Sequence, residues 1–211
     1  FVTGVQTCAL PILDTVVTGA KKSKEKAMLL GYSRKEKLSN LFDENLYVES
    51  FYAPHTLEID FASEENNRCF VCTVIRRTYS NIETKKKHIS AVQSGTESER
   101  YDSVMTVATK IKKGWYATLL AEAIDSSATI PMYILDAIAF AAKDILSEKL
   151  LWKMVSYSFN KYNLNSDYDD LKTAFEKAKS SEEIKGLIKE FCDKFPNDMV
   201  SLFISRAKGE D

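Results

Sequence analysis

The spacing of apolar residues divides the chain into a first segment with strand character and a longer helical remainder. Residues 13–19 contain a β-branched run, residues 15–18, and end in glycine, and residues 46–52 (LYVESFY) alternate apolar and polar positions. Runs of this kind predict β-strands. Residues 21–30, between them, are polar and compatible with a helix, and Pro54 closes the second strand because proline cannot donate to a ladder. This order predicts an α/β unit with a parallel pair of strands.

After residue 59 the pattern becomes helical. Residues 61–79, 101–112 and 115–124 are compatible with helices, and the polar segment 80–100 predicts a loop or a weak helix. Pro131 suits a first helical position. The apolar face expected for the helix after it consists of Ile134, Ile138, Ala141 and Ile145.

Residues 147–211 predict an all-helical C-terminal tail. Apolar residues recur at helical spacing throughout it, and Ser180 or Ser181 followed by Glu183 predicts a capping box at the start of one helix. Pro196 separates that helix from a short final one around residues 200–204. The expected domains are therefore residues 13–146, with a partial sheet and packed helices, and residues 147–211, a helical extension.

The first twelve residues, FVTGVQTCALPI, do not match the rest of the chain in character. The string resembles a translated sequencing adapter, which would exclude it from the fold. The alternative is a native β-strand cut from a longer chain. On either interpretation we expect the true N-terminus to be missing.

The net charge limits how the chain could bind nucleic acid, and the cysteine content indicates the cellular compartment. The net charge is −1, so contacts with DNA would have to come from local lysine clusters. Four cysteines, at 8, 69, 72 and 192, are too few for a disulfide scaffold and are typical of a reducing compartment. No apolar run approaches the ~20 residues that cross a bilayer. We therefore expect a cytoplasmic protein with no membrane partner.

Two segments carry candidate chemistry. The first is Thr56-Leu57-Glu58-Ile59-Asp60, directly after the second predicted strand. The second is Lys113-Gly114-Trp115-Tyr116-Ala117, followed by an apolar helix and by Ile130-Pro131-Met132-Tyr133-Ile134. Together they resemble the TOPRIM nuclease domain of the overcoming-lysogenization-defect (OLD) family of ATP-dependent endonucleases. The resemblance covers roughly residues 16–145 and implies a truncated TOPRIM-like parallel sheet.

The resemblance also implies roles for these residues. Glu58 would be a catalytic carboxylate and a ligand of Mg²⁺ or Mn²⁺, with Thr56 and Asp60 as further metal ligands. Lys113 would stabilise the anionic transition state of phosphodiester hydrolysis. DNA is the implied partner, and the candidate DNA-binding residues are Lys112, Lys85, Lys86 and Lys87.

The sequence also departs from the family. No Asp-x-Asp pair precedes residue 58 and no Gly-x-x-x-x-Gly-Lys-[Ser/Thr] motif is present, so ATP would act only through a separate N-terminal domain. We therefore expect the isolated fragment to be inactive and the full-length enzyme to be a homo-oligomer. The alternative function is a non-enzymatic helical module for interaction or oligomerisation. Cys69-x-x-Cys72 predicts two buried small residues rather than a zinc site.

Overall fold

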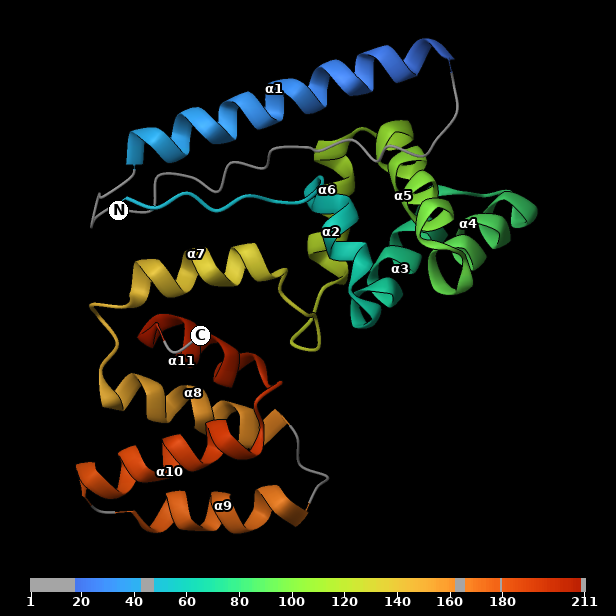
Figure 1. Ribbon diagram of the computed structural model, residues 1–211. Helices are drawn as coiled ribbons and strands as arrows, with labels where there is room; N and C mark the ends of the chain where they lie inside the picture. Colours follow the sequence, from blue (N-terminus) through green and yellow to red (C-terminus); the bar gives the residue numbers. More distant parts are fainter. Residues whose placement is uncertain (1–17, 43–47, 162–165, 179, 210–211) are drawn as a thin grey trace. The chain divides into compact units, whose positions relative to one another are not determined.

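The computed structural model describes residues 18–42, 48–161, 166–178 and 180–209 (Figure 1). These residues form helices joined by turns and loops, and no β-strand occurs among them. The chain divides into two compact units at Tyr133 and Ile134. We call them the N-terminal unit and the C-terminal unit. Within the described residues no helix is long and apolar enough to cross a membrane.

The predicted α/β fold with a TOPRIM-like parallel sheet is wrong for the described part of the chain. Thr18 and Gly19, expected at the end of a strand, begin α1 (Thr18–Phe42), whereas residues 13–17 lie outside the described residues. Residues 48–52, from the second predicted strand, have no regular secondary structure. The Tyr52 hydroxyl instead donates to the Lys35 carbonyl of α1 at 3.2 Å. Aromatic and β-branched residues favour any half-buried surface, and here a helix provides it without a ladder.

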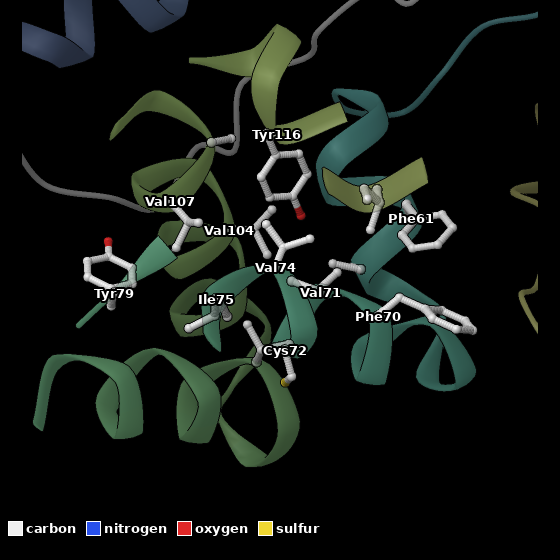
Figure 2. Packing of buried hydrophobic residues seen from close by; sticks show 14 residues of the cluster. Phe61, Phe70, Val71, Cys72, Val74, Ile75, Tyr79, Val104, Val107 and Tyr116 are labelled. Carbon is white, nitrogen blue, oxygen red and sulfur yellow. The ribbon is translucent and has the colours of Figure 1, made fainter. Parts of the chain in front are cut away.

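The N-terminal unit is built around α3. After α2 (Leu57–Ser63) and the short 3₁₀ helix η1 (Glu65–Asn67), the chain forms α3 (Arg68–Thr78), α4 (Ile82–Ser94), α5 (Glu97–Ile111) and α6 (Lys113–Ala123). Helix α3 packs against α4, α5 and α6, and α2 packs against α5. Figure 2 shows the shared core, which includes Val71, Val74, Ile75, Val104, Val107 and Tyr116.

The polar segment 80–100 contains α4 and the start of α5. Of the two structures predicted for it, a loop or a weak helix, the helix is correct. Asn81 caps α4 by accepting the Thr84 N–H at 2.9 Å. Thr96 and Glu99 form a capping box at the start of α5. Only Val92 of α4 is fully buried, which explains why the apolar pattern of this helix is weak.

A side-chain clamp fixes the loop that precedes α7 (Met132–Ala142). Asn67 is completely buried at the end of η1. Its amide nitrogen donates to the Thr129 carbonyl at 2.8 Å, and its amide oxygen accepts the Thr129 N–H at 2.8 Å. Both hydrogen-bonding groups of the Thr129 backbone are therefore satisfied by one side chain.

The C-terminal unit confirms the predicted helical series. It contains most of α7, followed by α8 (Glu148–Lys161), α9 (Ser166–Lys177), α10 (Ser181–Lys194) and α11 (Met199–Lys208). Phe159 packs edge-on against both Phe175 and Phe191 at its centre. The capping box forms between Ser180 and Glu183.

The apolar face predicted for α7 is wrong: Ile134 is half-buried, and Ile138, Ala141 and Ile145 are exposed. Leu135 and Ala139 are buried in the core of the C-terminal unit, whereas Ile138 and Ile145 are 46% and 72% exposed. Both sides of this helix are apolar, so periodicity alone did not identify the side that packs.

Candidate functional site

The structure brings Glu58 and Lys113 together. The Lys113 Nζ lies 3.5 Å from the Glu58 Oε2, and the two side chains are 52% and 15% exposed. Glu58 lies in the first turn of α2, where the helix dipole favours a negative charge, and Lys113 is the first residue of α6. Two residues from separate sequence motifs therefore meet at the ends of two helices, and not at the edge of a sheet.

The backbone before Lys113 is strained. Lys112 has φ 69° and ψ 138°, and it is the one non-glycine residue with positive φ in the described part of the chain. L-residues rarely adopt this conformation, which costs about 1–3 kcal/mol. It lets α5 end and α6 begin without a loop, since the Lys112 carbonyl accepts the Tyr116 N–H at 3.0 Å. The conformation of Lys112 thus sets the direction in which α6 begins at Lys113.

Thr56 and Asp60 are engaged by other groups. Thr56 precedes α2 without a side-chain capping bond, and its hydroxyl donates to the Met105 sulfur at 3.6 Å. Asp60 is buried, with Oδ1 2.9 Å from the His55 Nδ1 and Oδ2 accepting the His55 N–H at 3.3 Å. Burial raises the pKa of Asp60, and the hydrogen bonds from His55 oppose this shift.

The described residues alone do not fit the implied Mg²⁺ site. No group of three or more His, Cys, Asp or Glu side chains among them could hold a metal ion. Glu58 is a single carboxylate already paired with an ammonium group, and Mg²⁺ prefers a near-ideal octahedron of oxygens. Further oxygen ligands would have to come from outside these residues.

Two buried tyrosines near Glu58 had no predicted role. The hydroxyls of Tyr116 and Tyr133 are buried without a hydrogen-bond partner among the described residues. Burial raises the pKa of Tyr133 to about 12, with smaller contributions from the charges of Asp60 and Glu58. Burial also raises the pKa of Tyr116, again assisted by Glu58. Both phenols are therefore neutral, and in the sequence they resemble ordinary core residues.

Of the predicted DNA-binding lysines, three lie on α4 and one adjoins Lys113. Lys85, Lys86 and Lys87 lie on α4, where the Lys86 Nζ is 3.8 Å from the Glu83 Oε1. Lys87 lines an open cavity of about 600 Å³ between α4 and α5, together with His88 and Asp102. Lys112 is exposed directly beside Lys113.

The cysteine prediction is half correct. Cys72 is completely buried in the core of the N-terminal unit. Cys69 is exposed instead, and its thiol donates to the Asn66 carbonyl at 3.2 Å. The two thiols therefore do not share one buried environment.

No protein-family model, curated protein or solved structure matches this chain. The resemblance to the OLD endonucleases consequently depends on the two sequence motifs.

Proposed function

We propose that this chain is part of an ATP-dependent DNA endonuclease in which Glu58 and Lys113 lie at the scissile phosphate. One observation carries the proposal. The two motifs that resemble the nuclease are far apart in the sequence. The Glu58 carboxylate of the first nevertheless lies 3.5 Å from the Lys113 ammonium of the second, and this ammonium is half exposed.

Lys113 supplies positive charge to the phosphate. Its ammonium is half exposed and stands at the first residue of α6, so the helix dipole adds to the favourable potential for an anion. A fixed cation at the point where negative charge develops lowers the barrier without reorganisation during the reaction. Glu58 holds the ammonium in position while no phosphate is bound.

A divalent metal, Mg²⁺ or Mn²⁺, would require oxygen ligands beyond those described, and so we assign no step of the reaction to it in this chain. ATP would act through another domain. The isolated chain should therefore not nick plasmid DNA with either metal, relative to a Glu58→Ala control.

The decisive experiment uses the longer enzyme that contains this chain together with its ATPase domain. In single-turnover cleavage at saturating DNA, Lys113→Met should reduce the rate by roughly 10²–10³, which is typical of losing one preorganised donor or charge. Lys112→Met is the matched control: it should weaken DNA binding, but at saturating DNA it should cleave at nearly the wild-type rate. Equal rates for the two variants, or a larger defect in Lys112→Met, would contradict the role of Lys113.

A second candidate is a helical interaction module, favoured by the exposed Ile138 of α7 and the exposed Ile145 shortly after its end. If this module mediates homo-oligomerisation, Ile138→Glu should lower the mass measured by light scattering in solution. The control Lys153→Glu, at an exposed position of α8, should not change the mass.

A further inference from the structure

Trp115 is unusually exposed for its size. It shows 58% of its surface at the third position of α6, whereas its neighbour Tyr116 is completely buried. Tryptophan buries a large apolar area in most proteins, and an accessible indole is typical of a binding surface. The core of the N-terminal unit does not require this side chain.

The stretch of sequence that contains Trp115 is basic. Between Asp102 and Glu122 the chain contains three lysines, at 110, 112 and 113, and no acidic residue. Glu122, the one acidic residue of α6, is paired with Arg77 at 2.8 Å, and Glu58 neutralises Lys113 only. Lys112 is exposed. An uncompensated positive charge therefore accompanies the exposed indole.

The chain is also open where the lysines and the tryptophan meet. A side chain added at Gly114 would meet nothing within 4 Å. A ligand can therefore approach the backbone of α6 closely at Gly114.

We propose that Trp115 stacks on an unpaired DNA base while Lys112 and Lys113 contact the neighbouring phosphates. An accessible aromatic side chain beside cations is the arrangement by which proteins hold single-stranded nucleic acid. A base inside a duplex cannot offer its face to the indole without leaving the stack. The substrate class is therefore DNA with unpaired nucleotides, such as a single strand, a flap or a frayed end. The assignment of this strand as substrate rests on the proposed function, but the binding itself does not require cleavage.

The chain's two tryptophans allow a direct test, because Trp115 lies in this surface and Trp152 packs in the C-terminal unit. We would titrate the 211-residue chain with oligothymidylate at low salt and follow the tryptophan emission. Stacking should quench the emission of the wild type and of Trp152→Phe, but not that of Trp115→Phe. Trp115→Ala should bind about 5- to 150-fold more weakly, equivalent to ~1–3 kcal/mol for one stacked base.

Salt dependence tests the lysines. Lys112→Gln should reduce the slope of log affinity against log salt by about 0.7, the value for one contact with a single strand. Lys153→Gln, on the exposed side of α8, is the control and should leave the slope unchanged.

Quenching that persists in Trp115→Phe, or an unchanged affinity of Trp115→Ala, would overturn the inference. Equal quenching by a blunt duplex would overturn the preference for unpaired bases. Self-association that depends on Trp115, without any response to DNA, would assign the surface to a protein partner instead. These results are distinct from the cleavage assay: normal cleavage by Lys113→Met would remove the proposed function while leaving base stacking in this chain intact.

Discussion

Replacing Asn67 with aspartate tests the clamp on the loop before α7. The substitution preserves the shape of the side chain but removes its two N–H donors. The oxygen that accepts the Thr129 N–H would remain, whereas the group 2.8 Å from the Thr129 carbonyl would become a second oxygen. The site is completely buried, so water cannot replace the lost donor without a rearrangement.

The expected loss of stability is set by these contacts. An unsatisfied buried carbonyl costs about 1–3 kcal/mol. The new carboxylate also loses solvation and faces a carbonyl oxygen, so Asn67→Asp should lower the free energy of unfolding by at least ~3 kcal/mol near neutral pH. Protonation of the introduced carboxyl would restore a donor to Thr129. Stability lost at neutral pH should therefore return partly as the pH falls.

The assay is urea unfolding in a Trp152→Phe background, where Trp115 is the remaining tryptophan and its emission reports on the N-terminal unit. Asn66→Asp is the matched control, because the exposed Asn66 makes one 3.2 Å bond to the Thr129 hydroxyl. A similar loss in both variants, or a loss at position 67 independent of pH, would refute the role of the clamp.

Three further predictions concern the residues around the Glu58–Lys113 pair. Tyr116→Phe removes a buried hydroxyl without a described partner and should raise the free energy of unfolding by about 1–2 kcal/mol in urea; a decrease would reveal a partner for the hydroxyl. Lys112→Gly should raise the free energy of unfolding by about 1 kcal/mol, because glycine adopts a positive φ without strain. It should also weaken oligothymidylate binding in the tryptophan-emission titration. Burial raises the folded-state pKa of Asp60 above its usual 3.8, so the folded state binds the Asp60 proton more tightly than the unfolded state does. The protonated carboxyl therefore stabilises the fold below pH 3.8, and this stabilisation is lost as the pH rises through the folded-state pKa. Asp60→Asn should abolish that part of the decline, and an unchanged pH profile of urea midpoints would contradict it.

Residue patterns predicted the helices better than the fold. The helical series after residue 147 and the Ser180 capping box follow from local spacing and were confirmed. Two further caps, Asn81 before Thr84 and Thr96 before Glu99, are local signals that would have predicted the helices between residues 80 and 100. The sheet was wrong because residues 48–52 are half-buried by contacts such as that of Tyr52 with α1, which no periodicity reveals.

The candidate site was predictable only in part, for a similar reason. The motifs indicated Glu58 and Lys113, and the structure places these two side chains within 3.5 Å of each other. Their chemical roles remain a prediction. The partners of Thr56 and Asp60 depend on packing: Met105 is contributed by another helix, and His55 turns back onto Asp60. Sequence spacing contains no information about the first of these contacts.

The Glu58–Lys113 pair is too weak to hold the core of the N-terminal unit together. The core instead positions these two residues. Because the Lys113 ammonium is half exposed, water screens this ion pair, and pairs screened in this way contribute only ~0–1 kcal/mol. The burial of Tyr116, three residues after Lys113, is worth more than that, and in Figure 2 its ring lies over Val74 and Val104. Tyr116 therefore anchors the start of α6 whether or not the pair forms. Lys113 can then exchange Glu58 for a phosphate at little cost to folding, as a residue that binds a transient anion requires.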